Sequence, residues 1–117
     1  GRALAEFQTV QNWVADSVAE MQAARMLTLH AAWKMDQGDE ARVEISLIKF
    51  WGAKVLNDVL DRAIQVHGAL GFSEDTPLSG WYREARSARI YDGPDEVHRM
   101  VVARRMFKQA MARMAER

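Results

Sequence analysis

The longest uninterrupted stretch of this chain, residues 4–36, contains neither proline nor glycine, and no other feature limits the fold as much. Within it, apolar residues recur at steps of three and four: Phe7, Val10, Val14, Val18 and Met21. This spacing places them on one face of an α-helix, which reaches roughly 45 Å at about 1.5 Å per residue. We therefore expect a long amphipathic helix over this stretch.

The same signals predict a second helix. Gly38 suits a left-handed end to the first helix, and Asp39 with Glu40 can begin the next one, where free N–H groups and the positive end of the helix dipole favour acids. An apolar stripe then occupies residues 45–66. Gly52 lies inside it at a cost of about 1 kcal/mol relative to alanine, which indicates a close helix crossing.

Two further helices follow. Thr76 can act as N-cap for a third helix over residues 77–90, and Gly93 with Pro94 repeats the start signal before a fourth helix whose apolar stripe ends near Met114. There is no strand pattern. The sequence therefore predicts an all-α fold, an antiparallel (up-down) four-helix bundle, in one domain over the whole chain.

Composition excludes several classes of function. Sixteen acidic and sixteen basic residues give a formal net charge of zero, so no overall electrostatic attraction to nucleic acid or to an anionic membrane is expected. The lack of cysteine rules out disulfides and thiolate metal sites. No apolar run approaches the roughly 20 residues that span a bilayer. We expect a soluble, intracellular protein.

Four tryptophans are a large apolar load for helices this long: Trp13, Trp33, Trp51 and Trp81. Two interpretations remain open. Either all four fill the internal core, or some helix faces pack against a partner outside the chain.

Several polar patterns have an ordinary explanation beside a functional one. Asp95 and His98 have the spacing of half a di-metal site, but no second half exists, so a solvated helix start is favoured and no metal is expected. Gly68 and Gly71 favour a loop with positive φ angles whose exposed N–H groups can still hold phosphate. A row of arginines predicts a surface charge network, with partner or phosphate contacts as the alternative: Arg83, Arg86 and Arg89.

The stretch RIYDGPDEVH interrupts the helical pattern and places a lone carboxylate, Asp92, at the break. Unpaired N–H groups and the positive end of the next helix favour its ionised form. An ionised acid held at a break suits a catalytic base. From these local features alone, an N-terminal cap of the next helix is the favoured role.

Three segments closely resemble the C-terminal helical domain of the acyl-CoA dehydrogenase family. They are GRALAEFQTVQNWVAD at the start, AIQVHGALGF from Ala63, and WYREARSARIYDGPDEVHR from Trp81. Gln65 and Asp92 lie 27 positions apart, the family interval between its flavin-binding glutamine and its catalytic base. The resemblance covers nearly all of residues 1–117. It implies that the family's N-terminal helical and middle β domains are absent from this chain, which alone would be inactive.

The resemblance implies a FAD-dependent dehydrogenase that oxidises an acyl-CoA to its trans-2-enoyl product. Asp92 falls on the position of the base that removes the α-proton, while the β-hydride goes to flavin N5. The backbone N–H of the same residue would polarise the thioester carbonyl. Family members are homo-oligomers, typically tetramers, that share FAD across subunits, and electron-transferring flavoprotein is a possible partner.

The resemblance also assigns roles residue by residue. Gly93 matches a position beside the substrate. FAD-contacting positions match Gln8, then the segment toward a neighbouring subunit's FAD, Gln65, Val66, His67, Gly68 and Ala69, and finally the run Pro94, Asp95 and Glu96.

Three positions depart from the family pattern. Most members have glutamate where Asp92 stands, threonine at Pro94 and glycine at Ala69. The motif Asp-Gly-Pro-Asp-Glu-Val-His resembles that of a recognisable subgroup, which implies that aspartate is a working variant. Two alternatives remain: a non-catalytic helical oligomerisation module derived from the family, and a family member acting on a different substrate.

Overall fold

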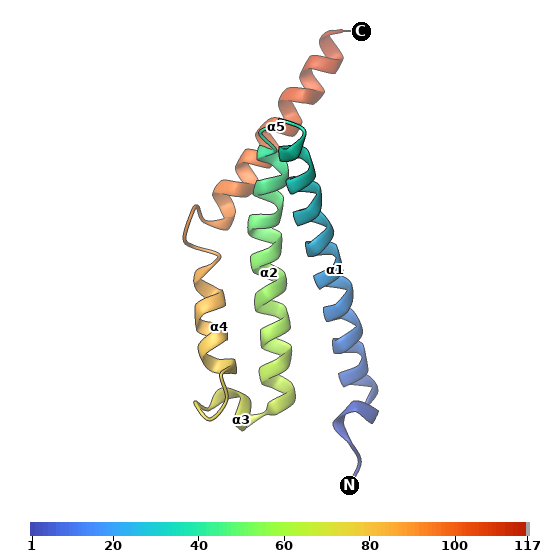
Figure 1. Cartoon of the computed structure of the whole chain (residues 1–117), viewed down its shortest axis with the longest axis vertical. Coiled ribbons are helices and arrows are strands. Elements are labelled where there is room, and N and C mark those ends of the chain that lie inside the picture. The colour runs from blue at the N-terminus through green and yellow to red at the C-terminus, as the bar shows by residue number, and fades with distance from the viewer. Residues whose placement is uncertain (117) are drawn as a thin grey trace.

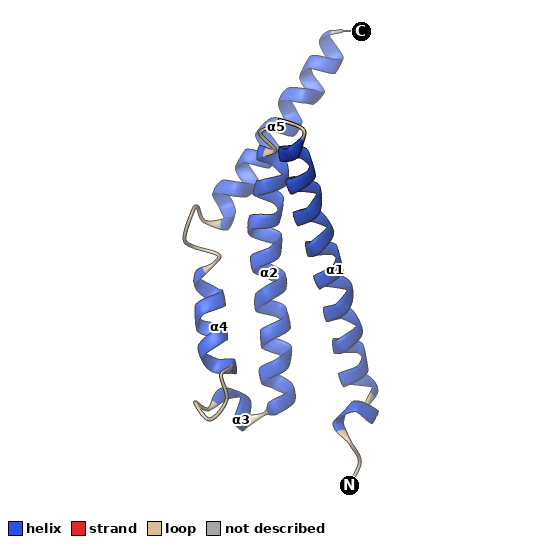
Figure 2. Ribbon diagram, in the orientation of Figure 1, coloured by secondary structure: helices blue, strands red, loops and turns tan. Residues whose placement is uncertain are grey.

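The computed structural model describes residues 1–116, and all of its regular elements are helices (Figure 2). Their bounds are η1 Leu4–Glu6, α1 Gln8–Asp36, α2 Arg42–His67, α3 Ala69–Phe72, α4 Leu78–Ser87 and α5 Asp95–Ala115. The all-α prediction is confirmed, and the four long helices are the four that the sequence predicts. The short helices η1 and α3 were not expected.

Helix α2 is the centre of the arrangement, because α1, α4 and α5 all pack against it. Figure 1 shows α1 and α4 running antiparallel to α2, while α5 crosses near the start of α2 and its last turns extend beyond the other helices. The molecule is accordingly elongated, with extents of 66 × 28 × 25 Å. Because each of the other long helices packs mainly against α2, much of the surface of those helices stays exposed.

The turn between α1 and α2 follows the predicted chemistry with a small shift. Gly38 adopts φ +82° and donates its N–H to the Met35 carbonyl at 2.9 Å, as a left-handed helix end requires. The Asp39 carboxylate accepts the Ala41 N–H at 2.9 Å. Ala41 itself has φ +47°, so α2 begins at Arg42, later than the acids alone indicate.

Two ion-pair clusters join α1 to α2. Arg62 donates to both carboxylate oxygens of Glu20, at 2.7 and 3.1 Å, and to the Ser17 hydroxyl at 3.1 Å. Toward the other end, Lys34 donates to Glu44 at 2.8 Å. The hydrogen bonds from Arg62 hold the pKa of Glu20 below its ordinary value of 4.5.

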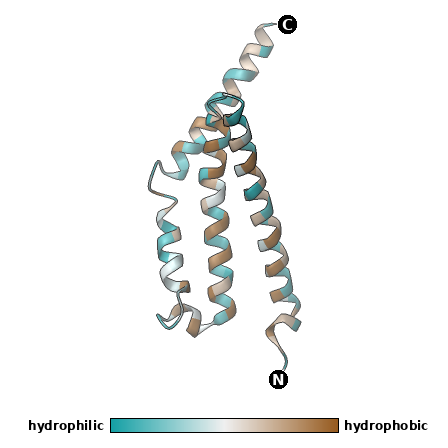
Figure 3. Cartoon of the chain, viewed as in Figure 1, coloured by the Kyte–Doolittle hydropathy of each residue, from teal (hydrophilic) through white to brown (hydrophobic). Residues whose placement is uncertain are grey.

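The internal core is narrow and made mostly of small side chains. Its buried apolar residues are Ala31, Ala41, Ala53, Val55, Leu60 and Ala85. Figure 3 shows apolar turns recurring along α1 and α2. Trp33 and Trp81 are 58% and 54% exposed, so the interpretation that all four tryptophans fill the core is wrong. Large apolar faces of this chain stay open to a partner.

The expected close crossing at Gly52 is also wrong. A Cβ placed there would meet only Ile48, at 3.2 Å, and Ile48 belongs to the same helix. Among the described residues, no helix is both long enough and apolar enough to pass through a membrane.

Candidate functional site

The connection between α4 and α5 contains two consecutive residues with positive φ angles. Asp92 has φ +53° and Gly93 has φ +91°, both in the left-handed region. Aspartate enters this region more readily than most side chains, and glycine enters it without strain. Helix α4 ends at Ser87 rather than near Ile90, and turns carry the chain on to the break.

Lys49 of α2 holds this break from one side. Its ammonium group donates to the carbonyls of Ala88 at 2.7 Å, Tyr91 at 2.9 Å and Gly93 at 3.4 Å. Its Nζ also lies 5.2 Å from the centre of the Tyr91 ring. One cation therefore neutralises the carbonyl end of α4 and fixes the main chain on both sides of Asp92.

His98 of α5 holds the break from the other side. Its Nε2 lies 3.1 Å from the Asp92 carbonyl, which can only accept, so Nε2–H is the donor. Its Nδ1 lies 3.3 Å from the Ser46 hydroxyl on α2. A Cβ on Gly93 would come within 2.9 Å of Nε2, so the ring needs glycine at that position.

These contacts use the carbonyl of Asp92 and leave its carboxylate outside. The side chain is exposed, and within residues 1–116 it forms no ion pair. The N-cap of α5 is Pro94, with no side-chain cap hydrogen bond. The N-cap role favoured for Asp92 from local features alone is therefore wrong.

Asp95 has a structural role that the sequence did not reveal. Its side chain is only 2% exposed, and it accepts from Arg89 Nε at 2.8 Å. The Asp95 N–H donates to the Arg89 carbonyl at 3.2 Å. The side-chain hydrogen bond to the Asp95 carboxylate raises the pKa of Arg89. The Asp95 Oδ1 is buried without a hydrogen-bond partner among the described residues. Arg89, one of the arginines predicted to form a surface charge network, thus pairs with the buried Asp95 and joins the end of α4 to the start of α5.

Asp95 and His98 turn to different partners rather than to a shared point. No group of three or more metal-binding side chains occurs among residues 1–116.

The other predicted site residues lie at the far end of α2. Gln8 begins α1, and residues 65–69 end α2 and start α3, which the antiparallel packing places at the same end of the molecule (Figure 1). His67 Nδ1–H donates to the Ala63 carbonyl at 2.7 Å. An apolar groove of about 290 Å³ between α1 and α2 includes Val66 and His67 in its lining.

The structure therefore divides the predicted residues into two clusters. The first, residues 92–96, contacts α2 near Ser46, and the second ends α2 at residues 65–69. Ser46 and Gln65 lie nineteen positions apart on the same helix, which corresponds to roughly 28 Å. The two clusters cannot meet the same few atoms of one ligand.

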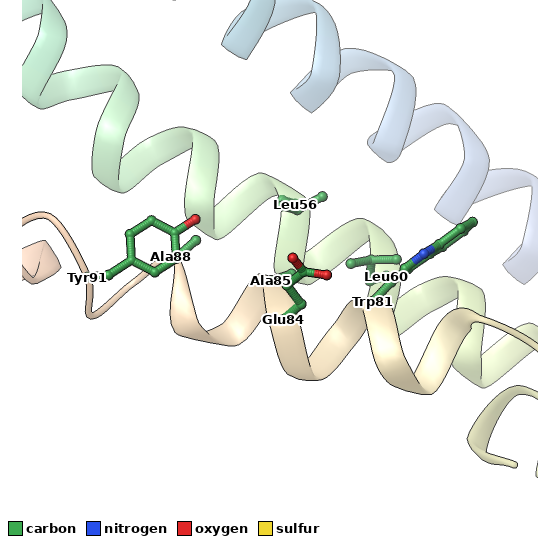
Figure 4. A pocket seen from close by; sticks show the side chains of 7 residues that line it. All are labelled: Leu56, Leu60, Trp81, Glu84, Ala85, Ala88 and Tyr91. Carbon is green, nitrogen blue, oxygen red and sulfur yellow. The ribbon is translucent and has the colours of Figure 1, made fainter. Parts of the chain in front are cut away.

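A hollow of about 300 Å³ lies between α2 and α4, beside the break. Figure 4 shows Tyr91 at one end and Trp81 at the other, with Leu56 and Leu60 of α2 along the groove between them. The remaining lining residues are Glu84, Ala85 and Ala88. The aromatic residue next to Asp92 thus extends along an apolar groove.

Residues 1–107 match the family model described as acyl-CoA dehydrogenase, C-terminal domain. The chain belongs to the acyl-CoA dehydrogenase family. It is 51% identical over 106 residues to a probable acyl-CoA dehydrogenase of Mycobacterium tuberculosis, and this match covers 89% of the chain and 26% of that protein.

Solved structures agree with this membership. Butyryl-CoA dehydrogenase from Megasphaera elsdenii superposes with a TM-score of 0.88 at 32% identity, over 92% of this chain and 28% of that one. The FAD complex of PigA superposes with a TM-score of 0.86 at 25% identity, over 91% and 28%. The chain thus spans about a quarter of the length of these three proteins, and its helical bundle is the one found in the acyl-CoA dehydrogenase family.

Most of the residues predicted to contact FAD are exposed. Gln8, Gln65, His67, Gly68 and Ala69 are exposed at one end of the bundle. Pro94 and Glu96 are likewise exposed. Asp95 fits less well, because its carboxylate and N–H are both engaged by Arg89.

Lys49, Ser46 and His98 are the residues of this site that sequence reasoning missed as a group. The available signal was a lysine between Ile48 and Phe50 in an otherwise apolar stretch. Such a charge needs a polar partner when helices pack around it.

Proposed function

We propose that this chain is the C-terminal domain of a FAD-dependent acyl-CoA dehydrogenase in which Asp92 removes the α-proton of the acyl-CoA. The observation that carries the proposal is the held break between α4 and α5. There, α2 and α5 bind the carbonyls around Asp92, while its carboxylate stays exposed. The exposed carboxylate and the N–H of one residue would then act on one substrate.

The α-proton of a thioester is too weakly acidic for a carboxylate unless the carbonyl oxygen is stabilised as charge develops. The Asp92 N–H would donate to that oxygen while the Asp92 carboxylate takes the proton from the neighbouring carbon. Bound FAD supplies the acceptor for the hydride that leaves the β-carbon. Loss of one proton and one hydride leaves the trans-2-enoyl product.

Aspartate in place of the usual glutamate fits the backbone found here. At φ +53° a short side chain with a polar tip is tolerated better than a longer one. The carboxylate is withdrawn by about one carbon–carbon bond, roughly 1.5 Å. The acyl chain would therefore bind closer to this helix break than in members with glutamate, which supports a subgroup marked by Asp-Gly-Pro-Asp-Glu-Val-His.

The exposed end cluster would contact the FAD of a neighbouring subunit. Gln8, Gln65 and residues 67–69 are exposed there beside an apolar groove that Val66 helps to line. The chain would work as a homo-oligomer that binds acyl-CoA. Electron-transferring flavoprotein is the proposed partner that reoxidises the flavin.

The test is Asp92→Asn in the complete flavoprotein, assayed by dye-linked turnover with straight and branched acyl-CoAs. Asparagine keeps the backbone conformation and the N–H but cannot accept the proton. We expect FAD content to stay normal and turnover to fall by at least about a hundredfold. Asp61→Asn, an exposed change on α2, is the matched control. Near-normal turnover in Asp92→Asn would remove Asp92 from the mechanism.

A second candidate, a non-catalytic oligomerisation module, is favoured by the open apolar faces of α1 and α5. The two differ in flavin content. A purified full-length protein with bound FAD that is bleached by an acyl-CoA supports the dehydrogenase. A protein that assembles but carries no flavin supports the module.

A further inference from the structure

We propose that Lys49 is a positioning residue that aims the Asp92 N–H at the thioester carbonyl. The inference rests on the proposed function, because it concerns how the break presents Asp92 to an acyl-CoA. It adds a residue of helix α2 that would act through the backbone carbonyls around Asp92.

The argument begins with the peptide that joins Tyr91 to Asp92. It is trans, so its carbonyl and its N–H point in opposite directions within one plane. The Tyr91 carbonyl accepts from Lys49 Nζ at 2.9 Å. The Asp92 N–H must therefore point away from Lys49 and α2. Within residues 1–116 no backbone carbonyl accepts that N–H.

The next peptide is fixed in the same way from the other side. The Asp92 carbonyl points at His98 Nε2. The carbonyl of the peptide after it, that of Gly93, lies 3.4 Å from Lys49 Nζ. Both φ and ψ of Asp92 are set by the orientation of the two peptide planes that meet at its Cα. Lys49 holds the first plane through the Tyr91 carbonyl, and His98 holds the second through the Asp92 carbonyl.

A lysine suits this role because its ammonium group has three donors and no acceptor. Those donors serve Ala88, Tyr91 and Gly93, whose carbonyls converge on one point. Without the cation, three converging carbonyl dipoles would repel one another. The left-handed conformation of Asp92 would then lose its main support, since that region is unfavourable for a residue with a side chain.

The experiment measures the stretching frequency of the thioester carbonyl in a bound ligand. The complete flavoprotein is loaded with a trans-2-enoyl-CoA labelled with carbon-13 at the thioester carbonyl, and isotope-edited infrared spectra give its stretching frequency. A hydrogen bond lowers that frequency. We expect Lys49→Met to move the band back toward that of the free thioester and to lower kcat by about ten- to a hundredfold. Lys49→Arg, which keeps a charged donor, should recover part of both.

Lys54→Met is the matched control, because Lys54 lies on the same helix but pairs with Asp58 on the surface. It should leave the carbonyl band and kcat unchanged. If Lys49→Met does not retain FAD, Lys49→Gln replaces it, and the same displacement of the band is expected. A band at the wild-type frequency in the variant measured overturns the proposal, whatever happens to turnover.

Asp92→Asn separates this proposal from the one on which it rests. It keeps the N–H, so we expect a wild-type carbonyl band together with lost turnover. Near-normal turnover in Asp92→Asn defeats the base assignment. Lost turnover in Asp92→Asn with an unshifted band in Lys49→Met defeats only the role of Lys49.

Discussion

Asp92 combines two chemical groups whose directions are set by different parts of the residue. The carboxylate is placed by the side chain, which is exposed, and the N–H is placed by the backbone, which α2 and α5 hold. A substitution can therefore change one group without the other. This separation makes single-residue tests at the break informative.

Gly93→Ala should disturb the break without touching the carboxylate. The residue has φ +91°, and an added Cβ would lie 2.9 Å from His98 Nε2. We expect a loss of roughly 1–3 kcal/mol in the free energy of unfolding, together with reduced turnover. Thermal unfolding and dye-linked assays measure both effects.

Gly80→Ala is the natural comparison for that variant. Gly80 lies inside α4 with nothing within 4 Å of its added Cβ, so alanine should stabilise the protein by about 0.5–1 kcal/mol. Equal effects of the two substitutions would contradict the strain assigned to Gly93.

At the scale of helices, most of the fold could be predicted from sequence patterns. Apolar stripes at steps of three and four predicted α1, α2 and α5, the start signal at Thr76 and Pro77 predicted α4, and Gly38 marked the end of α1 correctly. The helix starts were less predictable, because Ala41 and Pro94 act as N-caps without a side-chain hydrogen bond.

The contacts that fix the connection between α4 and α5 could not be predicted either, and the reason is different. Lys49 reaches residues 39 to 44 positions later in the chain. No local pattern connects a lysine in an apolar stripe with carbonyls so distant in sequence. Asp95 likewise showed a helix-start spacing, but burial against Arg89 decided its role. The functional roles of the site residues came from family resemblance and remain predictions.

The Arg62–Glu20 pair between α1 and α2 predicts an acid-dependent stability. The pKa of Glu20 is held below its ordinary value of 4.5 by Arg62. A carboxylate with a lowered folded-state pKa stabilises the fold above the unfolded pKa, and this contribution is lost as pH falls through the folded pKa.

Glu20→Gln should therefore lower stability near neutral pH by up to about 1 kcal/mol and flatten the loss below about pH 4.5. Thermal midpoints measured across that range test the prediction. Glu74→Gln, a change at an exposed loop carboxylate, is the control. Parallel acid profiles for wild type and Glu20→Gln would show that the pair contributes nothing.

At the scale of the whole molecule, the outer faces are too apolar for an isolated bundle. Exposed apolar side chains follow α1, among them Val14, Val18 and Met21, and others lie along the projecting end of α5, such as Phe107 and Met111. Contiguous surfaces of this kind are typical of contact sites. We infer that copies of the chain associate through them.

Val18→Glu should weaken this association by placing a charge on an apolar contact face. We expect sedimentation to show a smaller species than wild type at equal concentration. Gln22→Glu adds the same charge at an exposed polar position on α1 and should sediment as wild type. A wild-type protein that sediments only as a monomer would count against the inferred contact.

The roughly 28 Å between the two clusters on α2 bears on the smallest unit able to work. If the proposed function is correct, residues 92–96 of each copy belong to that copy's own active site. Residues 65–69 of the same copy belong to the active site of a neighbouring subunit. A monomer would then contain part of two active sites and no complete one. A mutation in residues 65–69 would therefore impair catalysis in the neighbouring subunit first.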